Sequence, residues 1–334
     1  MKSNNSIRNS KIEFLRILCI FFVIALHQVT AHMTDKQIPM LNYLYPFLNV
    51  SIYVFMLITG YLKATSNNYN FFNIIFIVAI CWVLNLIITP FILWDIKGKL
   101  DYLTVILGGR DWWYIWAFLI IQACVPILNL VLYKVRKNYL LPILIIMFAL
   151  FAYHSSMRYG QFFAIDNIIV FILLYFVGGI IKLYYPLQKV YWKYIFLTLV
   201  LAYWIVVVLV NTLTKFSLAK GLANFEVIPF AILIFCFTIS LKPSHAKFID
   251  YFGALVLYIY LFHFLFDNLV NYYIRPFYDH LDINLVYLLS FLQTFISSTV
   301  LAVLISKPIV KLANNLAQKP YFKKFFKAEN IYQS

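Results

Sequence analysis

The sequence predicts an all-α, polytopic membrane protein with about ten transmembrane helices. Hydrophobic residues make up 64% of its 334 residues and charged residues only 12%, whereas soluble domains are about half apolar and a quarter charged. The mean hydropathy is +0.85, and apolar runs of about 20 residues, enough to cross a bilayer, recur along the chain. Because unpaired backbone groups are too costly in lipid, each run is expected to be helical.

The apolar runs define a single integral-membrane domain over residues 1–334. The first run is interpreted as a membrane span and not as a cleaved signal peptide. The fifth is short, and the Lys-rich segment 306–334 is expected to be an interfacial cytoplasmic tail. The expected spans are 12–31, 43–62, 72–94, 112–133, 139–153, 164–181, 190–212, 222–241, 252–272 and 284–305.

The distribution of basic residues orients these spans. Of the 27 lysines and arginines, 18 fall on the side of the N-terminus, 8 on the other side, and Arg16 inside the first span. Lysine and arginine gather in cytoplasmic loops, so both termini are expected in the cytoplasm. The formal charge of +15 then reflects topology and attraction to the inner leaflet. Because the basic residues are scattered over short loops, no nucleic-acid partner is expected.

The four cysteines lie within apolar spans, at no spacing typical of a metal site. They are interpreted as packing residues, and neither a disulfide nor a bound metal is expected. They are Cys19, Cys81, Cys124 and Cys236.

The first span carries ionisable side chains near both of its ends. Arg16 and His27 are separated by ten residues, which is about 16 Å of helix and almost three turns, so both lie on nearly the same face. Glu13 lies three residues before Arg16, within side-chain reach. Ionisable residues inside a membrane usually face a protein interior or a water-filled path. The alternative is that Arg16 and His27 are separate interfacial residues.

A second polar pair lies in the ninth span. His263 and Asp267 are four residues apart, so they share a helix face and could form a histidine oriented by an acid. The alternative is ordinary hydrogen bonding between helices.

Five segments resemble, in the same order, elements of the integral-membrane acyltransferase family 3. The first is Arg16 and His27 with ten residues between them, which resembles the signature of the family's opening helix. The resemblance spans essentially the whole chain. The other segments are VFMLITGYL (54–62), with Thr59 where serine is usual, WWYIWAFLIIQACVPIL (112–128), YFVGGII (175–181) and YIYLFH (258–263).

The resemblance implies a bacterial inner-membrane enzyme that takes an acyl group, most often acetyl from cytoplasmic acetyl-CoA, and delivers it to a glycan hydroxyl outside the membrane. The glycan is expected to be a capsule or another surface polysaccharide. The implied partners are acyl-CoA, the glycan and the lipid bilayer, with no bound cofactor, and the oligomeric state is left open. The family's arginine and histidine correspond to Arg16 and His27.

The chain departs from the family after the second span. Many members carry a cluster of arginines there, whereas this chain reads KATSNNYNFFN, with Lys63 the one basic residue before Lys97. Lys63 and the loop that contains Lys134 and Arg136 are therefore candidate partners for the donor phosphates.

Arg16 and His27 are expected to have different roles in the reaction. Arg16 would bind an anionic part of the donor, since its planar fork suits phosphate. His27 would remove the proton of a sugar hydroxyl as that hydroxyl attacks the thioester, a task suited to a group that titrates near neutrality. A covalent acyl-histidine intermediate is the alternative mechanism.

Four further residues are candidates for supporting roles. Thr59 is a candidate for oxyanion contact and His263 for orienting the catalytic histidine, while Trp112 and Trp113 are candidates for stacking on the sugar. Each also has a structural interpretation. Thr59 lies next to a glycine where helices can pack closely, and the tryptophans can belong to an interfacial aromatic belt.

Two other classes of membrane protein remain as alternatives. A transporter or flippase of lipid-linked glycans is also polytopic and carries embedded charges, but no internal repeat is visible in the sequence. A glycan polymerase is expected to carry a large outer loop, and none of the outer loops here is long.

Overall fold

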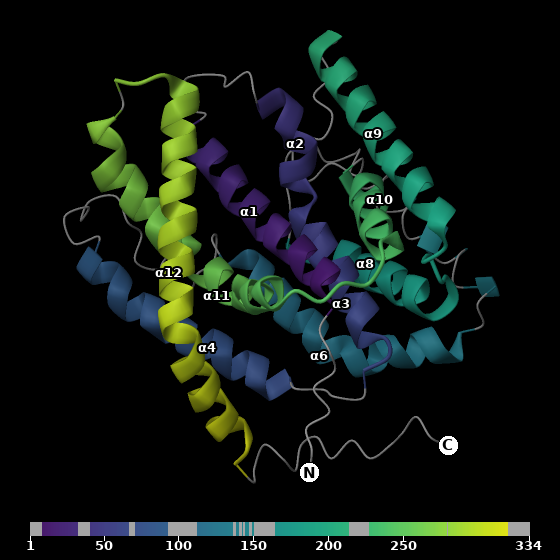
Figure 1. Cartoon of the computed structure of the whole chain (residues 1–334). Coiled ribbons are helices and arrows are strands. Elements are labelled where there is room, and N and C mark those ends of the chain that lie inside the picture. The colour runs from purple at the N-terminus through teal and green to yellow at the C-terminus, as the bar shows by residue number, and fades with distance from the viewer. Residues whose placement is uncertain are drawn as a thin grey trace.

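The computed structural model describes residues 9–32, 41–66, 71–92, 112–135, scattered residues between 138 and 149, and residues 164–213, 227–278 and 280–319. All regular structure in these ranges is helical, and they contain no strand (Figure 1). The predicted all-α class is confirmed for this part of the chain.

Helices occupy nine of the ten expected spans, and of the fifth, 139–153, only six scattered residues are described, all of them helical. Of the described helices, five are long and apolar enough to cross a membrane: α4, α6, α9, α12, and α11 with the turns that extend it to Phe277. Ten passes and cytoplasmic termini stay predictions. The helices are α1 (Ser10–His32), α2 (Leu41–Asn49), α3 (Ser51–Lys63), α4 (Phe71–Ile92), α6 (Trp113–Lys134), α8 (Ala164–Tyr184), α9 (Val190–Leu213), α10 (Val227–Ser240), α11 (Lys247–Leu269) and α12 (Ile283–Ala317).

Several expected spans have different limits in the structure, the second and the last among them. The second, 43–62, is divided into α2 and α3 by a turn at Val50. The last begins after Asp282, whose carboxylate accepts a hydrogen bond from the Asn284 backbone at 2.9 Å. This bond and one from the Asn284 side chain hold the pKa of Asp282 below its usual value.

Helix α12 runs twelve residues past its expected end at 305. Ser306, Ile309 and Ala313 are buried in this extension, and α12 packs against α4, α11 and α1. Hydropathy marks where lipid contact ends, but it does not mark where a helix ends. The first part of the expected tail 306–334 is therefore a packed continuation of the last helix.

Helix α1 is the central element of the bundle, and α9 is a peripheral one (Figure 1). α1 packs against α2, α3, α10, α11 and α12, whereas α9 packs against α10 and α2. Of the α9 side chains, Val200 and Val207 are buried, and most of the others are exposed and apolar. An apolar helix with so little protein contact is suited to face lipid.

Helices α3 and α8 approach each other closely because both have a glycine at the contact. A Cβ on Gly60 would lie 2.0 Å from the carbonyl oxygen of Tyr175, and one on Gly178 would lie 2.2 Å from that of Leu57. Small residues allow helix backbones this close in membranes. The contact fixes α3, and with it Lys63 at the C-terminal end of that helix.

Polar contacts gather several helix ends on one side of the bundle. The Lys11 ammonium donates to the carbonyl oxygens of Ile239 and Leu241, both at 2.7 Å. The Ser10 hydroxyl donates to the Asp250 carboxylate at 2.6 Å. The N-terminal ends of α1 and α11 therefore meet the C-terminal end of α10. This agrees with the predicted topology, in which these three helix ends lie on the same side of the membrane.

Candidate active site

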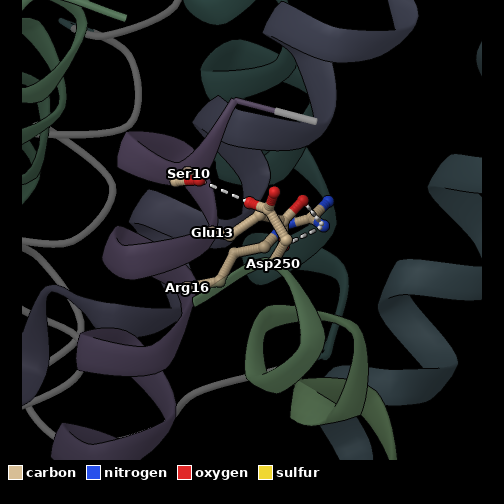
Figure 2. A network of polar contacts seen from close by, with 4 residues as sticks. All are labelled: Ser10, Glu13, Arg16 and Asp250. Carbon is tan, nitrogen blue, oxygen red and sulfur yellow. Dashed lines mark hydrogen bonds and ion pairs between the residues drawn. The ribbon is translucent and has the colours of Figure 1, made fainter. Parts of the chain in front are cut away.

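Arg16 is held by an ion pair within α1. Its Nη1 lies 3.3 Å from both carboxylate oxygens of Glu13 (Figure 2), as the spacing of the two residues predicts. Glu13 is buried and packs on α11 at Gly253, where a Cβ would lie 2.4 Å from Glu13 Oε2. The contact between α1 and α11 therefore limits where the Arg16 guanidinium can lie.

Arg16 lines a cavity of about 410 Å³ among α1, α3, α4, α6 and α11. Lys63 lines the same cavity, so two basic side chains border one space. Cations within the membrane-spanning part of a protein are unfavourable and commonly mark ligand or ion pathways. The other walls are mostly apolar or aromatic and include Phe55, Ile74, Phe118 and Leu257.

The cavity extends from the basic side chains into the bundle. Its lining residues on α3 run from Lys63 back to Phe55, and those on α11 from Gly253 to Tyr260. At 1.5 Å per residue, these stretches are each about 10–12 Å long. The inner part contains Tyr114 and Tyr260, whose ring centroids lie 5.4 Å apart. The site thus combines cations near the helix ends with an aromatic inner region.

A series of ring contacts connects this inner region to His27. The ring centroids of Tyr260 and His263 lie 5.2 Å apart, as do those of His263 and His27. Phe264 packs on both histidines at 4.2 and 4.4 Å. His263 is fully buried, while His27 is partly exposed. Arg16 and His27 therefore lie at different places: Arg16 lines the cavity, and His27 lies beyond its inner region.

The expected pair of His263 and Asp267 does not form. His263 Nδ1 lies 2.5 Å from the carbonyl oxygen of Tyr260, and its Nε2 has no hydrogen-bond partner among the described residues. Asp267 instead accepts hydrogen bonds from the side chains of Gln28 and Asn271. Contacts within the same turn and from α1 thus take the place of the i,i+4 pair, although both residues share a helix face.

The turn of α1 that contains His27 is fixed by buried polar contacts that the sequence alone does not predict. Gln28 also donates to the Thr294 hydroxyl of α12 at 3.0 Å, and the Tyr287 hydroxyl donates to the carbonyl oxygen of Ala25 at 3.0 Å. Gln28, Thr294 and Tyr287 are buried. Two sequence features could have indicated these contacts: a glutamine next to His27, and polar residues within the apolar run of α12.

The structure also locates the candidate donor and oxyanion residues. Thr59 lines the cavity, but its hydroxyl donates to the Phe55 carbonyl of its own helix at 2.8 Å, which favours the structural interpretation. Lys63 lines the cavity, whereas Lys134 is exposed at the end of α6 and is not part of the lining. Arg136 lies outside the described residues.

The candidate acceptor tryptophans are packed inside the protein. Trp112 is buried, and Trp113 stacks on Phe171 with ring centroids 6.2 Å apart. Neither contact requires a sugar. Both are packing contacts within the protein, whereas the alternative expected from the sequence was an interfacial aromatic belt.

Comparison with known proteins identifies one match. A family model described as an acyltransferase domain matches residues 9–307, a range that includes Arg16, His27 and the cavity. No curated protein and no solved structure matches the chain. Within the described ranges, no three histidine, cysteine or acidic side chains are grouped to hold a metal, and the four cysteines are free.

Proposed function

The chain belongs to acyltransferase family 3, and from this premise we propose that it transfers an acyl group, typically acetyl, from acyl-CoA to a sugar hydroxyl of a surface polysaccharide. The observation that carries the proposal is the arrangement of α1. This helix places Arg16 in a cavity with a second cation and places His27 beyond the inner region of that cavity. The proposed location is a bacterial inner membrane, with the Arg16 end of α1 toward the cytoplasm.

The basic part of the cavity is suited to the phosphates of the donor. Glu13 contacts only Nη1 of Arg16, so the rest of the guanidinium fork can face an anion. Arginine binds phosphate through paired, planar hydrogen bonds, and Lys63 adds a second positive charge. The apolar and aromatic walls then surround the uncharged arm of the donor.

The transfer needs one base, and His27 supplies it. His27 takes the proton of the sugar hydroxyl while the hydroxyl oxygen attacks the thioester carbonyl carbon. The bond between carbonyl carbon and sulfur breaks, and the proton passes from the imidazolium to the leaving thiolate. Because a thioester is already activated, the reaction needs neither a metal nor a serine nucleophile. In the alternative mechanism, the acyl group first moves to His27 and then to the sugar.

The residues around His27 act by holding its position. His263 packs against the His27 ring, and Gln28 ties the adjacent turn to α11 and α12. Holding the base in one orientation raises the reaction rate, because the reacting groups are already aligned.

Deletion of the gene in its host tests the proposal against the transporter alternative. NMR of the purified surface glycan gives the acyl content per repeat unit and the amount of glycan. The proposed enzyme predicts glycan in normal amount without the acyl group, and restoration by the wild-type gene. A transporter or polymerase predicts less glycan with unchanged acylation per repeat, and that result would overturn the proposal.

A further inference from the structure

Gln122 is a buried polar residue that has no role in the proposed transfer reaction. It lies in the middle of α6, is 2% exposed and lines the cavity. Its Oε1 has no hydrogen-bond partner among the described residues. More than about 90% of buried polar groups in proteins are hydrogen-bonded, and an unsatisfied one destabilises the fold. A side chain of this kind on a cavity wall is suited to a ligand.

The position of Gln122 along the cavity can be measured from the helices. Asn129 Nδ2 donates to the Lys63 carbonyl at 3.0 Å, so these two residues lie at one level. Gln122 precedes Asn129 by seven residues and therefore lies about 10 Å from this level along α6. Along α6 from this level, the cavity lining presents first the Lys63 cation, then the Gln122 amide, and then the ring of Tyr114, which contacts Tyr260.

We propose that the Gln122 side chain hydrogen-bonds a secondary amide in the phosphopantetheine arm of the acyl donor, and so makes this arm a determinant of donor specificity. This inference rests on the proposed function. A phosphopantetheine thioester has phosphate at one end, two secondary amides along a slender arm, and the acyl group at the other end. The cavity offers complementary groups in the same order.

The match does not depend on which way the glutamine amide is turned. A primary amide carries both an acceptor oxygen and a donor nitrogen, and a secondary amide carries one of each. Other residues that line the cavity, such as Phe55, Ile74 and Phe118, are apolar. An amide placed among them discriminates against arms that lack a hydrogen-bonding group, because the glutamine then stays unsatisfied.

Binding to the purified full-length protein in lipid nanodiscs tests the inference without knowledge of the acceptor. Calorimetry gives the Kd of CoA, 4′-phosphopantetheine, pantetheine and adenosine 3′,5′-bisphosphate, which lacks the arm. Gln122→Met keeps the length of the side chain but removes the amide. We expect it to raise the Kd of the three arm compounds about tenfold, the equivalent of one buried hydrogen bond, and to leave the bisphosphate unchanged. Gln188→Met makes the same change at an exposed site and should alter no Kd.

A change in the ligand provides a second test that does not depend on the variant folding. Wild-type protein should bind pantetheine about tenfold more tightly than an analogue in which an ester replaces the amide that contacts Gln122. The same compounds distinguish two possible carriers of the phosphopantetheine arm, free CoA and a carrier protein. Tighter binding of CoA than of 4′-phosphopantetheine indicates free CoA, and equal binding indicates an arm carried on a protein.

Two results would overturn the inference while leaving the proposed function intact. One is that Gln122→Met binds the arm compounds as wild type does, and the other is that it weakens the bisphosphate to the same extent. If wild-type protein binds none of the CoA compounds, the proposed donor itself is wrong.

Discussion

The two ends of α1 are built differently. Around Arg16 there is space: its side chain is 30% exposed and borders a cavity of about 410 Å³. Around His27 the neighbouring Gln28 is fully buried and bonded to two other helices. One end is therefore suited to admit a charged ligand, and the other to hold a side chain in one place.

This difference separates two kinds of defect. Changes at the Arg16 end should alter donor affinity, because the residues there border the ligand space. Changes at the His27 end should alter the rate of transfer and leave the affinity for CoA unchanged, since His27, Gln28 and His263 are not among the residues that line the cavity. The following variants test that separation.

His27→Ala should have the largest effect. Loss of a general base lowers the rate by about 10²- to 10⁴-fold, while the affinity for CoA should stay at the wild-type value. NMR of the acyl content per glycan repeat, at matched membrane abundance, measures the loss of transfer. Calorimetry with CoA measures the affinity. His280→Ala, at an exposed histidine before α12, is the control and should retain full transfer. Normal acylation by His27→Ala would remove His27 from the mechanism.

Arg16→Lys should be nearly as damaging as Arg16→Ala. Lysine keeps the charge but cannot reproduce the paired geometry of guanidinium with phosphate. Loss of charged hydrogen bonds should raise the Kd of CoA on the order of 10- to 100-fold. If Arg16 is only an interfacial anchor, lysine replaces it fully, since its side chain also reaches the headgroups. Wild-type affinity in Arg16→Lys would thus support the anchor interpretation.

Gln28→Met should reduce the rate with a smaller effect than either motif variant. It removes the hydrogen bonds to Asp267 and Thr294, and each lost partner in a buried site is equivalent to about 1–3 kcal/mol. We expect a roughly tenfold lower kcat and a lower Tm, with an unchanged Kd for CoA. A raised Kd with a normal kcat would contradict the assignment of this end of α1 to positioning.

Thr59→Val should have the smallest effect, even though Thr59 lines the cavity. Its hydroxyl is already bonded to the Phe55 carbonyl, so valine loses one hydrogen bond that is local to α3. Transfer should stay within about twofold of wild type, because a local bond of this type contributes little to a helix interior. A loss of 10²-fold or more would restore the oxyanion role.

The sequence alone determined the features that depend on solvent and on one helix at a time. Hydropathy predicts where most helices lie, because lipid leaves the backbone no other way to satisfy its hydrogen bonds. The Glu13–Arg16 contact was predictable for a similar reason, since residues three apart are neighbours on any α-helix. The shared face of Arg16 and His27 follows from the same geometry.

The tertiary structure decided which side chains meet between helices. It paired Asp267 with Gln28 and not with His263, and it brought Lys63 but not Lys134 to the cavity. These outcomes depend on how each helix is rotated and how closely it approaches its neighbours. The periodicity of one helix does not contain that information, because close approach is set jointly by contacts on two helices. The sequence therefore predicted the two ends of the candidate site on α1, and the packing of the other helices formed the cavity that Arg16 lines.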